Sequence, residues 1–338
     1  MKLPLTVVFV ATALIFGGCA TKPSQPDWVA GDSAKYTNTQ YLIGRGQAST
    51  IEDAEDRARA DLAKIFQVAV AVRSEDVQSY KSAPENAAGP GQYAGESSRH
   101  ITTRTDQIIS GIQIAEIWQD PVSKTRYALA ILPRMQTAAS LREQINQLDD
   151  ATQASIDQSK NTPDLFIKIA AASKAVESQL EREGLQKALQ VVDITGRGVD
   201  PKFSSGKLSA DMDDLLKRVR IAPRVAEGSA PGLDEIVAGA LSHAGFMIDT
   251  GDKPDYFLKA SLKLADLGLK EGWYWQRGDL EITLSEAVTG RVRGTQHWFV
   301  KGAAPDKETA IRRALDEADA VLKKELRPAI ISMAVGQK

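Results

Sequence analysis

The chain has 338 residues, of which 43% are hydrophobic, and its 42 lysines and arginines nearly balance 44 aspartates and glutamates. This balance gives no basic surface of the kind that nucleic-acid-binding proteins use, so no nucleic-acid partner is expected. The length allows two domains with packed hydrophobic cores, and a single cysteine excludes disulfides within the chain.

Residues 1–18 have the features of a secretory signal peptide. Met1 and Lys2 form a short positive region, and residues 3–16 are apolar and uncharged. This apolar run is shorter than the roughly 20 residues that a membrane-spanning helix needs. The glycines at positions 17 and 18 supply small residues beside a processing site, so cleavage is expected there.

Cys19 directly follows these glycines and resembles the cysteine of the bacterial lipobox, which becomes the lipidated first residue of the mature protein. Phe16 departs from the leucine that usually lies three positions before that cysteine, while Leu14 and Ile15 lie just upstream. The alternative, a buried or reactive thiol, is disfavoured between a removable segment and a polar tether. Acylation of Cys19 would anchor the protein to a membrane. Ala20, in place of a retention aspartate, favours the outer membrane, facing the periplasm.

After a lipidated tether at residues 19–26, residues 27–134 predict an α+β domain. Tyr41 to Ser49 predict a strand that ends in a glycine turn, and Ser49 with Glu52 has capping-box spacing. Small and apolar residues then recur every three or four positions to about Ala69, which predicts an amphipathic helix covering a sheet. Residues 82–98 predict a mobile excursion, and residues 112–131 a β-hairpin.

Residues 135–193 predict a different texture, a pair of helices that fold back on each other as an antiparallel spacer. Apolar residues recur with four-three spacing, and Asn161 to Pro163 interrupt the pattern. A coiled-coil dimer is the alternative, and polar residues on the stripe such as Thr152 favour the hairpin. Residues 194–213 are expected to be a linker.

Residues 214–338 predict a second α+β module. Four alternating stretches predict strands after a first one around residues 218–225, and residues 232–245 predict a helix that ends at Gly245. The last helix is expected from Asp306 to about Leu326, near Pro328. Short turns between consecutive strands predict an antiparallel sheet with two helices on one face.

Motifs for catalysis and cofactor binding are incomplete. The pair Gly44 and Gly46 lacks the third glycine and the parallel strands of a dinucleotide site, and Gly206-Lys207 lacks the flanking residues of a phosphate-binding loop. His100, His243 and His297 lie in separate segments, whereas metal sites use locally paired ligands. We therefore expect no catalytic residues, no metal and no cofactor.

The stretch EGWYWQRGD holds the most unusual surface candidate. Strand alternation places Trp273 and Trp275 on one face and Tyr274 on the other. With Arg277 nearby, the two indoles predict an aromatic platform for a partner or a glycan. The alternative, that both indoles fill the core between sheet and helices, is favoured because this module has few other large residues.

Several of these segments resemble one family. PDWV, YLIGRGQAS, EDAEDRARADLAKIFQVAV and RYALAILPR, spanning about Pro26 to Arg134, together with the lipobox, resemble the bacterial Lpp-twenty lipoprotein family. A similar module forms the N-terminal part of a flagellar basal-body ring protein. The resemblance implies an outer-membrane lipoprotein without known catalysis, often tied to motility or envelope architecture.

These observations predict a lipid-anchored, non-catalytic periplasmic scaffold with two α+β modules. Its expected partners are the membrane, through the lipid, and envelope or flagellar proteins, with peptidoglycan as a further candidate. The alternatives are an activator of a peptidoglycan synthase and, with no specific support, a periplasmic hydrolase.

Overall fold

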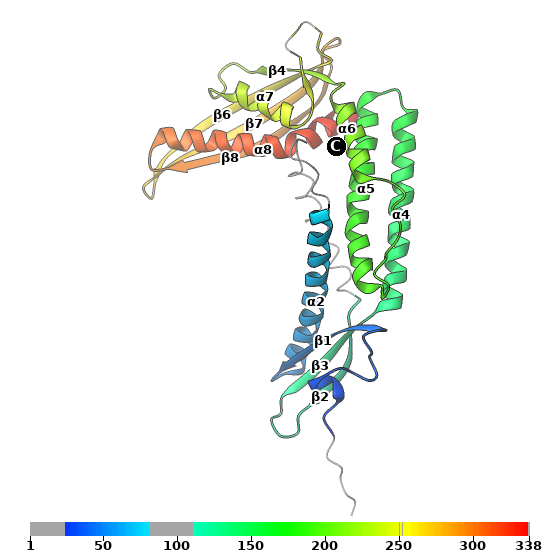
Figure 1. The fold of residues 1–338 in the computed structure, drawn as a ribbon. Helices are drawn as coiled ribbons and strands as arrows, with labels where there is room; N and C mark the ends of the chain where they lie inside the picture. The colour runs from blue at the N-terminus through cyan, green and yellow to red at the C-terminus, as the bar shows by residue number, and fades with distance from the viewer. Residues whose placement is uncertain (1–23, 81–110, 250, 252, 337–338) are drawn as a thin grey trace, which may run out of the picture. The chain divides into compact units, whose positions relative to one another are not determined.

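A computed structural model of the protein describes residues 24–80, 111–249, 251 and 253–336 (Figure 1). The chain divides into two compact units, residues 1–68 with 109–134 and residues 69–108 with 135–338. The class is α+β in both units, as predicted. The predictions for the signal peptide, for Cys19 and for the excursion at residues 82–98 lie outside the described residues.

The first unit contains a three-stranded antiparallel sheet with the strand order β1-β3-β2. The predicted strand, long helix and hairpin are all present. The elements of this unit are α1 (Asp27–Ala30), β1 (Tyr41–Ala48), α2 (Ile51–Tyr80), β2 (Gln113–Gln119) and β3 (Arg126–Pro133).

Helix α2 packs closely on one face of this sheet. Gly44 and Gly46 of β1 permit the approach, because a Cβ at either position would overlap the backbone of α2. The predicted capping box of Ser49 and Glu52 is shifted by one residue: the amide of Asp53 donates to the hydroxyl of Thr50 at 3.1 Å. The strand ends early enough for Thr50 to take the cap position.

The opposite face of the same sheet is covered by the segment that follows the tether. Trp28 is buried there against Leu129 and Ile131, and its indole N–H donates to Glu116 at 2.7 Å. Arg45 of β1 donates to the backbone carbonyl of Trp28 at 2.7 Å. Strand β3 is consequently buried on both faces, as its unbroken run of buried residues from 128 to 132 shows.

The second unit begins with two antiparallel helices, α4 (Arg134–Asn161) and α5 (Leu165–Val192). This is the predicted helical hairpin. Buried Arg182 on α5 forms an ion pair of 2.8 Å with buried Asp149 on α4 and also donates to the backbone carbonyls of Val199 and Asp200. The pair therefore fixes the register of the two helices and the path of the chain that follows them.

The expectation of a linker at residues 194–213 differs from the structure, which has helix α6 (Ser205–Leu216) there. The hydroxyl of Ser204 accepts from the amide of Lys207 as the N-cap, and Met212 and Leu216 are buried. The hairpin is also no separate spacer, because Phe166 and Ile169 of α5 belong to the same core as the C-terminal sheet. Its apolar stripe is wide enough to serve both partners.

A five-stranded sheet with the order β5-β4-β6-β7-β8 forms the rest of the unit. Strands β6, β7 and β8 are antiparallel, but β4 runs parallel to β5 and β6, so the predicted antiparallel sheet is in fact mixed. The helix after β4 is the cause, since it returns the chain to the same edge of the sheet. The elements are β4 (Arg220–Val225), α7 (Leu233–His243), β5 (Met247–Ile248), β6 (Tyr256–Lys270), β7 (Trp273–Glu286), β8 (Val292–Ala304) and α8 (Lys307–Val335).

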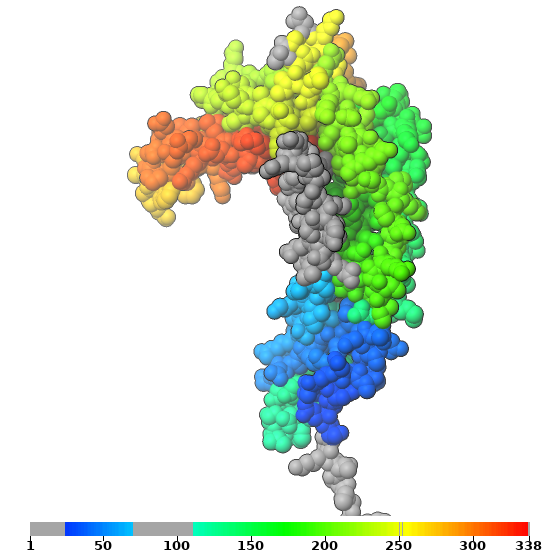
Figure 2. All heavy atoms as spheres, viewed as in Figure 1, coloured from blue at the N-terminus to red at the C-terminus, as the bar shows by residue number. Residues whose placement is uncertain are grey.

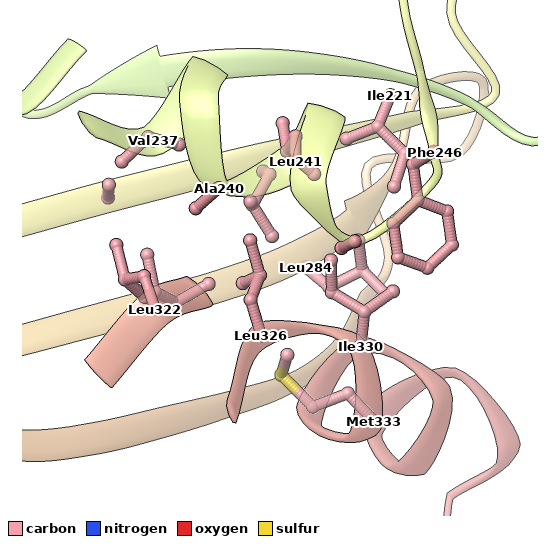
Figure 3. Packing of buried hydrophobic residues seen from close by; sticks show 14 of the residues in the cluster. Ile221, Val237, Ala240, Leu241, Phe246, Leu284, Leu322, Leu326, Ile330 and Met333 are labelled. Atoms are coloured by element: carbon pink, nitrogen blue, oxygen red, sulfur yellow. The ribbon is translucent and has the colours of Figure 1, made fainter. Parts of the chain in front are cut away.

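Helices α7 and α8 lie on one face of this sheet, as predicted (Figure 1). Figure 3 shows the core between them, where Leu241 of α7 and Leu326 and Ile330 of α8 converge near Leu284 of β7. All four side chains are fully buried. This apolar layer is the main source of stability in the second unit.

The prediction that the last helix ends near Pro328 is wrong, because α8 continues to Val335. Proline lacks the N–H that would bond to the carbonyl four residues earlier. The turns beyond it carry Ile330 and Met333 into the core, and their burial offsets the lost bond. The predicted start is confirmed: Asp306 is the N-cap and accepts from the amide of Thr309 at 2.8 Å.

Candidate functional site

Strand β7 presents its two faces to different surroundings. Gln276, Gly278 and Leu280 point towards α8 and are buried, whereas Trp273 and Trp275 are 42% and 37% exposed. The favoured prediction that both indoles fill the core is therefore wrong. Helix α8 lies so close to this end of the sheet that a Cβ at Gly302 of β8 would overlap its backbone, which leaves no room for an indole.

The exposed aromatic side chains share their face of the sheet with basic residues. Arg277 lies opposite Lys301 in the register, and its guanidinium carbon is 5.1 Å from the ring centre of Phe299, which is 68% exposed. We call Trp273, Trp275, Arg277 and Phe299 the aromatic patch. The structure thus brings the three predicted residues together on one open face and adds Phe299 to them.

Phe299 was not singled out in the sequence. Alternation along RVRGTQHWFV places Phe299 and His297 on the face opposite to Trp298, and that pattern was a usable signal. What the pattern lacked was the identity of the covered face. Only the packing of α8 over Gly302 decides it.

The remainder of the open face is polar. His297 lies between two carboxylates, with Nδ1 3.5 Å from Asp279 and Nε2 3.6 Å from Glu281. The hydroxyls of Thr283 and Thr295 are hydrogen-bonded across β7 and β8 at 3.0 Å. The apolar side chains are therefore concentrated at one end of a face that is otherwise solvated.

An ion pair ties the hairpin of β6 and β7 to the start of α8. Lys307 donates to Asp266 at 2.7 Å, and this bond, together with one from the backbone N–H of Gly268, holds the pKa of Asp266 below its ordinary value. The same carboxylate raises the pKa of Lys307. The end of the sheet that carries the patch is thus braced against the helix.

The residues considered for catalysis are not assembled into a site. His243 lies on α7 and His297 on the open face, while His100 is outside the described residues. Gly44 and Gly46 serve the packing of α2 rather than a phosphate. Among the described residues, no group of three or more histidines, cysteines and carboxylates could hold a metal ion.

The two largest hollows described in the second unit differ from the aromatic patch in composition. One, of about 550 Å³, lies at the other end of the sheet and is lined by Arg220 and Asp255, which pair with each other at 3.0 Å. Burial opposes ionisation of Asp255, but the bonds from Arg220 keep its pKa below the ordinary value. The other, of about 340 Å³, lies among α4, α5 and α6. No histidine is among the described residues that line either hollow.

No helix in the described part of the chain has the length and apolar character needed to cross a membrane. Any membrane attachment of this part must therefore use another route, such as a lipid or an interfacial contact.

Comparison with known proteins identifies the first unit. Residues 26–132 match the model of the LPP20 lipoprotein family, which confirms the Lpp-twenty resemblance over this segment. The segment contains the three strands and α2 of the first unit, except the last residue of β3. The second unit lies outside the match, and the similarity to a flagellar ring protein stays a prediction.

Solved structures with local similarity include two described as lipoproteins. A candidate lipoprotein from Caulobacter crescentus is 21% identical, with 35% of this chain and 92% of that chain covered and a TM-score of 0.26. For the minor lipoprotein of Acinetobacter baumannii the values are 10%, 36%, 93% and 0.24. The secreted protein HP1454 of Helicobacter pylori is 11% identical, with 88% and 99% covered and a TM-score of 0.38. These scores support no argument about function. None of the curated proteins matched the sequence.

Proposed function

We propose that this protein is a lipid-anchored lipoprotein of the outer membrane that faces the periplasm and acts as a non-catalytic scaffold. Its docking surface is the aromatic patch. One observation carries the proposal: Trp273, Trp275 and Phe299 are exposed together on a sheet face that no described helix covers. Exposed aromatic clusters beside arginine are typical of binding surfaces in soluble proteins.

The anchor is supported by the lipobox at Cys19 and by the family match that begins seven residues later. The segment that follows the tether is firmly attached to the first unit, because Trp28 is buried and Arg45 binds its backbone. Residues 20–26 span at most about 25 Å when extended, so the first unit would stay near the membrane.

Activation of a peptidoglycan synthase is the second candidate function. Helices α4 and α5 each have 28 residues, and such helices are about 42 Å long. A hairpin of this length, sharing its core with the sheet, would suit contact with an enzyme at a distance from its own anchor. A hydrolase has no comparable support in the described residues.

The test of the proposal compares the wild type with Cys19→Ser and with Trp273→Ser/Trp275→Ser in cells. We expect Cys19→Ser to leave the membrane fraction, and the tryptophan variant to remain in it but to lose the crosslinks of the wild type to envelope components. Full membrane retention of Cys19→Ser would contradict the anchor, and unchanged crosslinks would contradict the docking surface. Deletion then separates the roles: loss of flagellar assembly indicates motility, and loss of wall integrity indicates synthase activation.

A further inference from the structure

The hairpin between β6 and β7 ends in an exposed apolar tip, which we define as residues 267–275. Leu267, Leu269, Trp273 and Trp275 are each more than a third exposed. Figure 1 shows that the hairpin ends beside the first turns of α8, at the end of the sheet away from α4 and α5. In Figure 2 its yellow atoms form the outer margin of the second unit next to the orange start of α8.

Both faces of the tip are apolar. In the register, Leu269 pairs with Tyr274 on the side of α8, whereas Trp273 and Trp275 point to the open side. Isolated exposed apolar residues are ordinary on protein surfaces, but two leucines and two tryptophans within nine residues of one turn are not.

We propose that the hairpin tip inserts into the interfacial layer of an anionic phospholipid bilayer and gives the protein a second membrane contact. The inference rests on the proposed function, because it names the component that the aromatic patch docks. The indole has an apolar body and a polar N–H, and tryptophan is accordingly enriched at the level of lipid headgroups. Leucine side chains beside it reach the acyl boundary.

The shape of the tip favours a bilayer over a glycan or a protein groove. A sugar stacks on one flat aromatic face, which would leave Leu267 and Leu269 without a use. A protein groove would contact chiefly one side of the hairpin. A bilayer surrounds whatever enters it, so apolar side chains on both faces of the hairpin are all buried.

The charges around the tip complement anionic headgroups. Lys270 lies within it, and Arg277 and Lys301 lie just behind it on the open face. No ion pair engages these three cations among the described residues, whereas Asp266 is already neutralised by Lys307. Each basic residue near an anionic surface adds about 1 kcal/mol of attraction.

The tip is held in one conformation. Glu271 and Gly272 form a two-residue turn with φ values of 51° and 80°, the positive values of the type I′ turn that suits the twist of a hairpin. A bulge between Asp266 and Leu269 redirects the side chains of the last β6 residues. The ordering of the loop therefore precedes binding, which lowers the entropic cost of insertion.

The test uses the mature chain with Cys19→Ser, which lacks acyl chains, and vesicles of phosphatidylethanolamine and phosphatidylglycerol, some with brominated acyl chains. We expect the protein to float with the vesicles and its tryptophan fluorescence to be quenched by the bromine. Replacing both tip indoles, as Trp273→Ser/Trp275→Ser, should weaken partitioning by about tenfold or more and abolish the quenching. Lys270→Glu/Lys301→Glu should weaken it by at least about fivefold, and only with phosphatidylglycerol present.

The matched control is Val288→Ser/Val292→Ser. These valines are 94% and 58% exposed at the opposite end of the same sheet, so their loss should leave partitioning unchanged. Absence of vesicle binding, equal loss in the control, or sedimentation with peptidoglycan sacculi in place of flotation would overturn the inference. If vesicles fail but the in-cell crosslinks still depend on the two tryptophans, only the lipid assignment fails and the docking surface stands. Loss of both results would refute the two proposals together.

Discussion

In each unit a strand at the sheet edge is followed by a helix whose side chains close the outer edge of that strand. A carboxylate accepts from a strand amide 16 residues earlier, and an arginine donates to a strand carbonyl 10 residues earlier, with the same separations in both units. The four bonds are Arg45 N–H to Asp61, Arg57 to the Gln47 carbonyl, Lys301 N–H to Glu317, and Arg313 to the Ala303 carbonyl. Such closure protects an edge strand from pairing with other chains.

The packing beneath these bonds is also the same. Gly46 lies against Ala54 and Ala58 of α2, and Gly302 lies against the two alanines at matching positions of α8. The order of elements differs, since the hairpin follows the helix in the first unit and precedes the strand in the second. One local arrangement therefore builds both sheets.

The two units differ on the face of the sheet away from the helix. In the first unit Trp28 covers Leu129 and Ile131 there. In the second unit the corresponding face carries exposed Trp275 and Phe299. The comparison teaches that the same strand and helix can support either a closed face, which holds the chain after the anchor, or an open face, which is available to a partner.

The largest expected effect comes from the two tryptophans that define this difference. Trp28→Ala should lower the free energy of unfolding of the first unit by about 3–5 kcal/mol, because it removes a buried indole. Trp275→Ala should cost less than about 1 kcal/mol in the second unit, since the indole is already exposed. Urea unfolding of both variants measures the two values, and similar losses would contradict the assignment of closed and open faces.

The shared packing predicts the next effect. Gly46→Val and Gly302→Val each force side-chain atoms into the backbone of the following helix and should cost about 1–3 kcal/mol or more. Gly290→Val, at a turn with nothing within 4 Å of a Cβ, controls for the loss of glycine, although its φ of 70° adds local strain. Calorimetry should show one transition lowered by each core variant, and a tolerated valine at either crossing would show that the two arrangements are not equivalent.

Edge closure predicts a smaller effect. Asp61→Ala and Glu317→Ala each remove one side-chain acceptor from an exposed strand amide, which should cost about 0.5–1.5 kcal/mol. Asp61→Asn and Glu317→Gln keep an acceptor oxygen and should recover most of the loss. Chemical denaturation reads both pairs. A loss in one unit only would indicate that the bonds differ in importance.

The smallest effect is a pH dependence confined to the second unit. The pKa of Asp266 lies below its ordinary value of 3.8, so its contribution is present above that value and is lost as the pH falls through the lowered pKa. The melting temperature of the wild type should therefore exceed that of Asp266→Asn at about pH 6 and match it near pH 2. A difference that persists at the lower pH would exclude the ion pair with Lys307 as its source.

Much of this architecture follows from the sequence. Period-two alternation and three-four spacing predicted β1, α2, the first hairpin and the helical pair, because these patterns reflect which residues share a face. The parallel pairing of β4 and the continuation of α8 beyond Pro328 were missed, since both depend on tertiary contacts with the core. For Trp273 and Trp275 the shared face was predicted correctly. The covered side was not, because few identical residues reveal that Gly302 repeats the role of Gly46.

The open face can be tested directly by a photoreactive residue introduced in cells at position 299, with position 292 as control. Both positions are exposed on β8, one within the aromatic patch and one at the far end of the strand. The account predicts an adduct at position 299, identified by mass as lipid, protein or glycan, and none at position 292. The absence of an adduct at position 299, or equal adducts at both positions, would contradict a docking surface at the aromatic patch.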